Sequence, residues 1–285
     1  MTALRESSAL IARIGDRDAP PLVMGILNVT PDSFSDGGEF LDVERAVRHG
    51  VTMAHDGAGL VDVGGESTRP GAAGVSDDEQ IARVVPVITA LATALPDECA
   101  ISIDARSARV ANAAIAAGAT LVNDISAGAD PAMGSVVAAH GVPIVLMHMQ
   151  GTPETMQLAP SYADVVNEVR DFLLERAARL ERDGVARRQI VLDPGIGFGK
   201  TRRHNLELLS RLEVFVATGY PMLLGTSRKR FMGAICRETD PRELVGATCA
   251  TTTLGVDAGV RIVRVHDVRE NRQALEVVWA IRHPE

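Results

Sequence analysis

The chain has 285 residues, of which 46% are hydrophobic and 3% are aromatic, and its formal net charge at pH 7 is −8. The negative charge argues against a general surface for nucleic acid or anionic membranes, and the large apolar share argues against disorder. The length suits one α/β barrel domain, whose core is expected to consist of Val, Ile, Leu and Ala because aromatic residues are scarce.

The first 20 residues show no hydrophobic periodicity, and we expect them to form a tail, or a plug beneath the domain that residues 21–285 form. They carry charges of both signs and no long apolar stretch, so we expect neither a signal peptide nor a membrane span. The cysteines, Cys99, Cys236 and Cys249, are odd in number and lack metal-ligand spacing. This pattern predicts reduced, mostly buried thiols in a cytoplasmic protein.

Short apolar runs alternate with helical segments along the rest of the chain, and we expect strands to begin near residues 22, 60, 100, 120, 142, 189, 221 and 260. A strand followed by a helix, repeated in this way, predicts a single (β/α)8 TIM barrel with parallel strands. An open doubly wound sheet is the alternative. That fold carries a glycine-rich loop after its first strand, where this chain has NVTPD (28–32).

Each apolar run ends in polar residues, namely Asn28, Glu66, Asp104, Asn123 with Asp124, His148, Asp193, Ser227 and His266. The carboxyl ends of barrel strands converge on one mouth, and barrel enzymes keep their chemistry there. The same layout therefore predicts both the fold and the position of an active site.

Several helix boundaries are marked in the sequence. Ser76 and Glu79 form a capping box pattern, and Asp240 and Asp267 are placed to cap the helices that follow them. Helix ends are predicted at Gly57, Gly118, Gly184 and Gly219, where the chain must turn left-handed.

Two long polar loops follow the first and second strands, at residues 30–40 and 67–74. Their content of Gly, Pro, Ser and Asp is typical of mobile lids that close over a ligand. Phe34 in the first loop is an apolar residue with no evident core to join, which favours a role at the ligand.

Asp104, Asn123 and Asp193 each follow an apolar strand, and together they predict a subsite for a flat, nitrogen-rich heterocycle. A carboxylate accepts from a pair of N–H groups, while an amide both donates and accepts. The alternative for each Asp alone is a helix N-cap. The glycine-rich stretch after Asp193 lacks the spacing of a Walker loop, and we interpret Gly195 and Gly197 as letting the backbone approach the ligand.

A cationic group follows the last two strands. It comprises SRKR (227–230) together with Arg264 and His266, which strand alternation places on one side. Barrels commonly bind phosphate in these loops, and Arg69 in the second polar loop offers another donor fork. An acidic protein that gathers cations here is expected to hold an anion.

Two further strand exits are less specific. Asn28 offers an amide oxygen to a Mg²⁺ ion that also binds phosphate oxygens and water. His148 is either functional or merely satisfies a neighbour, and both interpretations stay open. The sequence shows no Ser-His-Asp motif and no His-rich metal cluster.

Nearly the whole chain, from about residue 23 to residue 281, resembles the dihydropteroate synthases, bacterial folate-pathway enzymes of the pterin-binding family. The segments that carry the resemblance occur in the family's order: GILNVTPDSFSDGG (25–38), VDVGGESTRPGA (61–72), ISIDAR (101–106), LVNDIS (121–126), VLMHMQGTP (145–153), LDPGIGFGKT (192–201), LGTSRKRFMG (224–233) and IVRVHDV (262–268). The chain departs from the family at Ala105, where a hydroxyl residue is common, and in its longer N-terminal segment. Neither departure changes a key polar atom of a motif.

The resemblance implies a (β/α)8 fold, a Mg²⁺ cofactor, usually a homodimer, and a place among the sulfonamide targets. It also implies a transferase reaction, in which p-aminobenzoate and 6-hydroxymethyl-7,8-dihydropterin diphosphate give 7,8-dihydropteroate and pyrophosphate.

Residue roles come from matching positions in the family's motifs. The resemblance implies pterin binding by Asp104, Asn123, Asp193, Lys229, Ile125, Met147, Phe198 and Gly225. It implies diphosphate binding by Asn28, Arg69, Arg264 and His266, with Asn28 also on the metal. It implies p-aminobenzoate binding by Phe34, Thr68, Pro70 and Ser227, and catalytic roles for Asp36, Lys229, Arg264 and His266.

An aryl amine is a weak nucleophile, so we expect C–O cleavage to be the difficult step and the substitution to be dissociative. The dihydropterin delocalises the positive charge, Asp36 supports it, and loop closure excludes water. The alternatives are a pterin-dependent methyltransferase, which has no use for the Arg264 and His266 pair, and a catalytically silent pterin-binding homologue.

Overall fold

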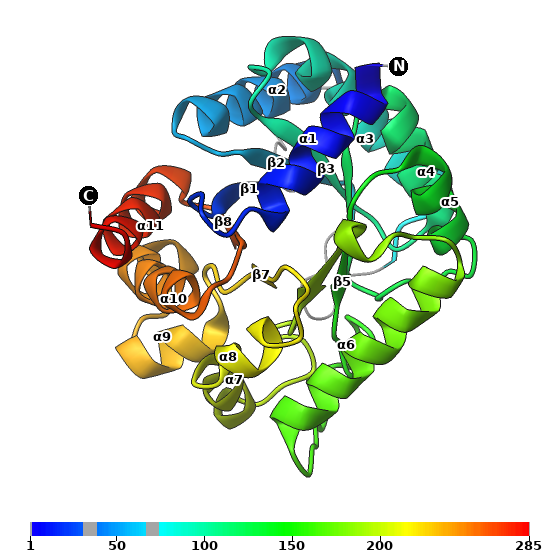
Figure 1. Cartoon of the computed structure of the whole chain (residues 1–285). Helices are drawn as coiled ribbons and strands as arrows, with labels where there is room; N and C mark the ends of the chain where they lie inside the picture. The colour runs from blue at the N-terminus through cyan, green and yellow to red at the C-terminus, as the bar shows by residue number, and fades with distance from the viewer. Residues whose placement is uncertain (1, 31–38, 67–73, 285) are drawn as a thin grey trace.

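The computed structural model describes residues 2–30, 39–66 and 74–284 and shows a (β/α)8 barrel (Figure 1). Its parallel strands are β1 (Leu22–Asn28), β2 (Leu60–Gly64), β3 (Ala100–Asp104), β4 (Leu121–Asp124), β5 (Ile144–Met147), β6 (Ile190–Asp193), β7 (Leu223–Leu224) and β8 (Ile262–Val265). They pair in the order β6-β5-β4-β3-β2-β1-β8-β7. A bridge between Leu192 and Met222 brings the two edges of this sheet together. The predicted barrel is confirmed, and each strand begins within two residues of its predicted start.

Helices surround the strands, as Figure 1 shows. They are α1 (Thr2–Gly15), α2 (Glu39–His55), α3 (Asp77–Ala94), α4 (Ala108–Ala117), α5 (Met133–His140), α6 (Val165–Arg182), α7 (Arg202–Leu209), α8 (Leu212–Val216), α9 (Arg230–Cys236), α10 (Val245–Ala258) and α11 (Val268–Arg282). Among the residues described, none of these helices is both long and apolar enough to cross a membrane.

The predicted helix boundaries are confirmed in part. Ser76 caps α3 by accepting from the Glu79 N–H, but the Glu79 carboxylate pairs with Arg83 and does not complete the box. Asp240 caps a short 3-10 turn that precedes α10. Asp267 occupies the predicted N-cap position of α11, but its carboxylate makes no capping hydrogen bond and binds Arg228 instead. Positive φ angles mark the predicted glycine helix ends, at Gly57, Gly118, Gly184 and Gly219.

Side chains alternate along each strand between the surrounding helices and the barrel interior. The interior has an apolar floor made by Leu22, Met24, Leu60, Leu121, Val145, Val191, Leu223 and Ile262. Leu10 and Ile14 of α1 pack against this floor, so α1 plugs one end of the barrel. The predicted lack of periodicity in residues 1–20 is wrong, since Ser7, Leu10 and Ile14 share one buried helical face.

Arg261, just before β8, ties this plug to the barrel. Its guanidinium donates to the carbonyl oxygens of Ile14 at 3.2 Å and Ala19 at 2.8 Å. Leu22, the first residue of β1, pairs in register with Ile262, the residue after Arg261 and the first of β8. The plug, the first strand and the last strand therefore form one joint.

The cysteines are all free thiols. Cys99 is buried, as predicted, and burial raises its pKa to about 11. Cys249 is only half-buried and Cys236 is exposed at the end of α9, so the prediction of mostly buried thiols is wrong for these two.

Candidate active site

The mouth of the barrel carries a polar layer directly above the apolar floor. Because strand alternation has a period of two, a residue two positions after a floor residue faces the same interior. This spacing accounts for Asp62, Asn123, Asp193, Gly225 and Arg264. Strand register also aligns Asn28 with Gly64, Gly64 with Asp104, and Asp104 with Asn123, across four neighbouring strands.

Asp62 is the centre of this layer. Its side chain is fully buried, and one oxygen accepts from the Ser102 hydroxyl at 2.5 Å. The other oxygen accepts from Asn123 Nδ2 at 3.0 Å and from Arg264 Nε at 2.7 Å. A buried carboxylate needs such donors to offset its lost hydration. Asp62 therefore fixes the orientation of two predicted site residues.

Arg264 joins Asp62 to Asp104, since its Nη2 donates to Asp104 Oδ2 at 2.9 Å. Burial raises the pKa of Asp104 to about 7; the Arg264 guanidinium opposes this shift and nearby carboxylates, Asp62 first, reinforce it. The Arg264 guanidinium therefore forms ion pairs with two carboxylates of the polar layer, Asp62 and Asp104. The predicted diphosphate-binding Arg264 lies beside the predicted pterin-binding Asp104 rather than in a separate anion site.

Asp193 and Lys229 form a second charged group of the layer. Burial raises the pKa of Asp193 to about 6, against the lowering effects of the Gly195 N–H and of the Lys229, Lys200 and Arg264 charges. Burial also lowers the pKa of Lys229 to about 8. The Lys229 ammonium lies 4.1 Å from the centre of the Phe198 ring, in cation–π contact.

The glycine-rich loop after Asp193 packs against the exit of β5. A side chain at Gly195 would place its Cβ 1.9 Å from the His148 carbonyl oxygen, and at Gly199 one would lie 2.4 Å from the Gln150 carbonyl oxygen. At Gly197, the nearest atom to such a Cβ is Lys229 Cδ, at 3.0 Å. At Gly195 the chain's own backbone therefore fills the space that we expected a ligand to approach, whereas at Gly197 the neighbour is the side chain of Lys229, itself a predicted pterin-binding residue.

His148 binds a neighbouring side chain, which agrees with the second of its two open interpretations. Its Nδ1 lies 2.9 Å from Lys200 Nζ, and its ring makes an edge contact with Phe172. Burial, followed by the charge of Lys200, lowers the pKa of His148 to about 3. The imidazole is consequently neutral near pH 7, and Nδ1 accepts the hydrogen bond.

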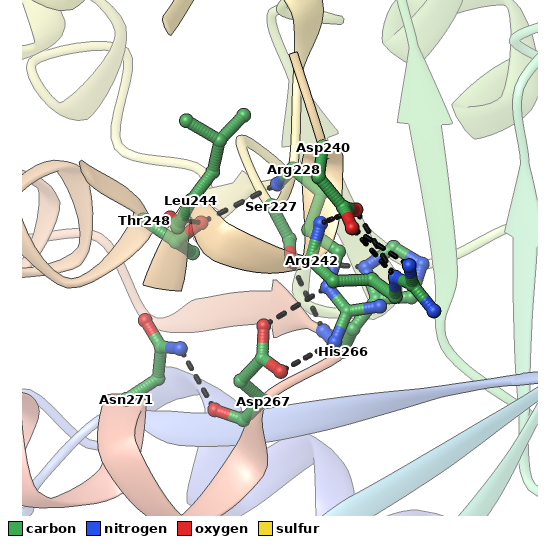
Figure 2. Close-up of polar contacts among 9 residues, drawn as sticks. All are labelled: Ser227, Arg228, Asp240, Arg242, Leu244, Thr248, His266, Asp267 and Asn271. Atoms are coloured by element: carbon green, nitrogen blue, oxygen red, sulfur yellow. Dashed lines mark hydrogen bonds and ion pairs between the residues drawn. The ribbon is translucent and has the colours of Figure 1, made fainter. Parts of the chain in front are cut away.

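The exits of β7 and β8 are joined, as Figure 2 shows. Ser227 Oγ lies 3.0 Å from His266 Nδ1 and accepts from the His266 backbone N–H at 3.1 Å. Arg228 makes a two-pronged ion pair with Asp267, with Nη2 2.5 Å from Oδ1. The predicted cationic group is thus divided, because Arg228 is engaged by Asp267 while Lys229 faces Asp193.

The remaining predicted residues fall into two sets. Met147 and Ile125 are buried at the ends of β5 and β4, and Gly225 lies close to Asp193 and Arg264. The other predicted residues, Phe34, Asp36, Thr68, Arg69 and Pro70, lie outside the described residues.

Two important residues were missed by the sequence reasoning. Asp62 stands inside the second apolar run, and its even spacing from Leu60 and Gly64 is the signal that places it inside the barrel. Lys200 is buried among the carbonyl groups of the loop after Asp193. No local pattern marks Lys200, since its acceptors come partly from another strand exit.

Comparison with known proteins agrees with this geometry. The model of a family described as "Pterin binding enzyme" matches residues 24–266. A curated relative from Mycobacterium leprae (strain TN), named dihydropteroate synthase, is 48% identical over 274 residues, covering 93% of this chain and 95% of the relative.

Solved structures give the same result. The dihydropteroate synthase of Xanthomonas albilineans with 4-aminobenzoic acid superposes with a TM-score of 0.87 at 44% identity, covering 93% of this chain and 94% of the other. The Yersinia pestis dihydropteroate synthase in a sulfonamide drug complex gives a TM-score of 0.88 at 42% identity, with 94% and 96% coverage.

Proposed function

The chain belongs to the pterin-binding enzyme family, among the dihydropteroate synthases, and on this basis we propose how the polar layer of its barrel carries out the family's reaction. In that reaction the amine of p-aminobenzoate replaces the diphosphate of 6-hydroxymethyl-7,8-dihydropterin diphosphate. The products are 7,8-dihydropteroate and pyrophosphate.

The main support for this proposal is the set of carboxylate, amide and ammonium groups that lies around Asp62 and Asp193. A pterin presents neighbouring N–H donors and ring acceptors in one plane, which match the carboxylates of Asp104 and Asp193 and the amide of Asn123. Lys229 supplies a donor from beside the Phe198 ring, 4.1 Å away. Ile125, Met147, Phe198 and Gly225 would form the walls of this pterin subsite.

The diphosphate would lie at the ends of β8 and β1. Arg264 offers a guanidinium at the interior, and His266 follows it by two residues on the same side of the chain. Arg69 and Asn28 would complete this subsite. We propose that Arg264 and His266 stabilise the negative charge that develops on the leaving group.

Magnesium fits this end of the mouth only as an ion shared with substrate. No group of three or more His, Cys, Asp or Glu side chains in the described ranges is placed to hold a metal ion. Mg²⁺ commonly takes one or two protein ligands beside phosphate oxygens and water, and the partly exposed Asn28 amide suits that donor set. The ion would neutralise charge on the diphosphate.

Metal titration in the presence and absence of the diphosphate substrate tests this proposal. Substrate binding that does not depend on Mg²⁺ would contradict it.

The p-aminobenzoate subsite would be formed by Phe34, Thr68, Pro70 and Ser227. Ser227 is the one member of this set within the described residues, and its hydroxyl is held by His266 at 3.0 Å. The amine would therefore approach beside the leaving diphosphate. Asp36 would support positive charge on the pterin methylene carbon while water is excluded.

Pyrophosphate release by the purified protein tests the proposal. We expect release with both substrates and Mg²⁺, and none when p-aminobenzoate is omitted. Release without p-aminobenzoate, or no release with the full mixture, would contradict it. A methyltransferase or a silent pterin-binding protein would give the second result.

We also propose that the p-aminobenzoate subsite accepts sulfonamides, because a relative of similar structure is known in a sulfonamide drug complex. Competitive inhibition against p-aminobenzoate is the expected result, and inhibition independent of its concentration would argue against a shared site.

We further propose a cytoplasmic location, with which the free thiols are consistent.

A homodimer is proposed from the outer face of the barrel. The neighbouring helices α10 and α11 (Figure 1) expose Leu254, Val277 and Ile281, the last two at 61% and 69%. Val277 and Ile281 are four residues apart on α11 and so share one helical face, and exposed apolar patches are typical of association surfaces. Val277→Lys combined with Ile281→Lys should therefore give a monomer by sedimentation, and an unchanged mass would place the interface elsewhere.

A further inference from the structure

Lys200 is a buried amine that the reaction described above does not use. Burial lowers its pKa to about 7 while the Asp193 charge raises it, so the ammonium form predominates below pH 7. Lys200 is 3% exposed, and its ammonium lies among four acceptors. Nζ is 2.9 Å from His148 Nδ1, from the Gly195 carbonyl oxygen and from the Phe198 carbonyl oxygen, and 3.3 Å from the His148 carbonyl oxygen. These acceptors come from the exits of two different strands, β5 and β6.

The loop around this ammonium is held almost entirely by side chains. The Gly197 carbonyl accepts from Gln157 Nε2 at 2.9 Å, and the Gly199 carbonyl accepts from the Tyr162 hydroxyl at 2.7 Å. The Gly197 N–H donates to Asn205 Oδ1 at 2.7 Å. With the contacts of Lys200, these bonds fix the path of the backbone from residue 195 to residue 199.

Both ends of this loop carry residues of the proposed pterin subsite. The Gly195 N–H donates to Asp193 Oδ1 at 2.7 Å and so orients that carboxylate. Three residues further on, the Phe198 ring lies beneath the Lys229 ammonium. A loop that shifted by a fraction of an ångström would move Asp193, Phe198 and Lys229 together.

We propose that Lys200 is a positioning residue for pterin binding, whose ammonium clamps the loop at residues 195–199 to His148 and thereby holds Asp193 and Phe198 in place. The inference rests on the proposed pterin-binding role of Asp193. The charge also acts directly, because Lys200 lowers the pKa of Asp193 while burial raises it. The other charged groups that face Asp193 are Lys229 and Arg264, and both act in the same direction.

Lysine suits this position for a geometric reason. The ammonium has three N–H donors and no acceptor, and neutral His148 accepts one of them through Nδ1. Removing the ammonium would leave buried carbonyl oxygens without donors, which is the costly outcome for a polar group.

The experiment compares Lys200→Met with Arg203→Met, a matched variant that removes an exposed cation three residues away on α7. We expect Lys200→Met to raise the KM for the dihydropterin diphosphate about tenfold or more and to leave the KM for p-aminobenzoate unchanged. Arg203→Met should change neither. Equal increases in both constants would show a general structural defect and overturn the proposal.

A pH profile supplies the second measurement. Two carboxylates of the proposed pterin subsite have raised pKa values, about 7 for Asp104 and about 6 for Asp193. The fall in affinity as the pH drops through about 6 in the wild type is the one that belongs to Asp193. Without the Lys200 charge this fall should begin at higher pH, and Lys200→Gln, which keeps donors but loses the charge, should show the same shift with a smaller loss of affinity. An acid limb that does not move in either variant would overturn the proposal.

Two further outcomes are decisive. If Asp193→Asn keeps full pterin affinity, the proposed pterin subsite fails, whatever Lys200→Met does. If Asp193→Asn loses affinity while Lys200→Met binds like the wild type, only the inference about Lys200 fails. Should neither Lys200→Met nor Lys200→Gln fold, as judged by circular dichroism, Lys200 would be a requirement of folding and the positioning role would be overturned.

Discussion

Arg264 donates Nη2 to Asp104 Oδ2 at 2.9 Å, which places a residue of the proposed diphosphate subsite in an ion pair with a residue of the proposed pterin subsite. The two subsites are therefore coupled through one guanidinium. A substrate that binds both Arg264 and Asp104 must compete with the ion pair between them. We therefore expect these residues to act together rather than independently.

Replacing Arg264 with Ala should weaken binding of the diphosphate substrate more than binding of the free pterin alcohol, because only the former carries the anion. The Asp104 contact makes some loss for the alcohol expected as well. Calorimetric titration with both ligands measures the ratio of affinities. The exposed Arg188, which precedes β6 at the end of the strand away from the mouth, is changed to Ala as the control. Equal losses for both ligands would contradict a role of Arg264 at the diphosphate.

Replacing Asp193 with Ala should abolish measurable pterin binding. The change removes a carboxylate that the Gly195 N–H orients at 2.7 Å, and a buried N–H pair of the ligand would then lack its acceptor. Calorimetry with the dihydropterin diphosphate measures the effect, and unaltered affinity would rule out the assignment.

Replacing Asp62 with Asn should lower the free energy of unfolding by about 3–5 kcal/mol, since the Arg264 guanidinium would lose a buried charged partner. Asp78→Asn is the matched control, because its ion pair with Arg109 is exposed at the surface and should contribute under about 1 kcal/mol. Urea unfolding compares the two variants. Similar small losses in both would show that Asp62 does not organise the layer.

Replacing His148 with Gln should make stability less sensitive to acid. The folded-state pKa of His148 is lowered to about 3 from 6.5, so between these values the unfolded chain binds a proton that the folded chain does not. Stability from this group is present above pH 6.5 and is lost as the pH falls toward 3, by up to about 1.4 kcal/mol per pH unit. Gln does not titrate.

Urea unfolding of wild type and His148→Gln at pH 7.5 and pH 5 checks this expectation. Burial raises the pKa of Asp104, Asp124 and Asp193, and protonation of these groups favours the folded chain at low pH. That contribution is common to both proteins, so it cancels in their difference. A difference in unfolding free energy that is the same at both pH values would contradict the prediction.

The barrel was predictable because apolar runs alternate with helical segments, and most of the described site because polar residues end those runs. A period of two then decides which side chains face the interior. Asp104, Asn123 and Asp193 end apolar runs, and the ends of parallel strands meet. Asp62 follows the alternation of β2, but it lies between two valines in the middle of the strand and does not end an apolar run. Its role depends on donors from β3, β4 and β8, which no local pattern reveals.

The contacts of the loop after Asp193 were beyond prediction for a related reason. The glycines of that loop signal close approach, yet the sequence does not tell whether a ligand or the chain itself approaches. In the structure, His148 and Gln150 do so. The first helix was missed because its few buried residues, such as Leu10 and Ile14, are separated by polar ones.

The joint between the plug, β1 and β8 has a consequence for how the chain reaches its native state. Arg261 and Ile14 are 247 residues apart in sequence, so the contact forms only after nearly the whole polypeptide has left the ribosome. Until then β1 has one unpaired edge and the interior floor is open to water. Contacts of such sequence separation slow folding, and exposed strand edges favour aggregation. Closure by the last strand is therefore expected to be the step at which this barrel most needs protection from other chains.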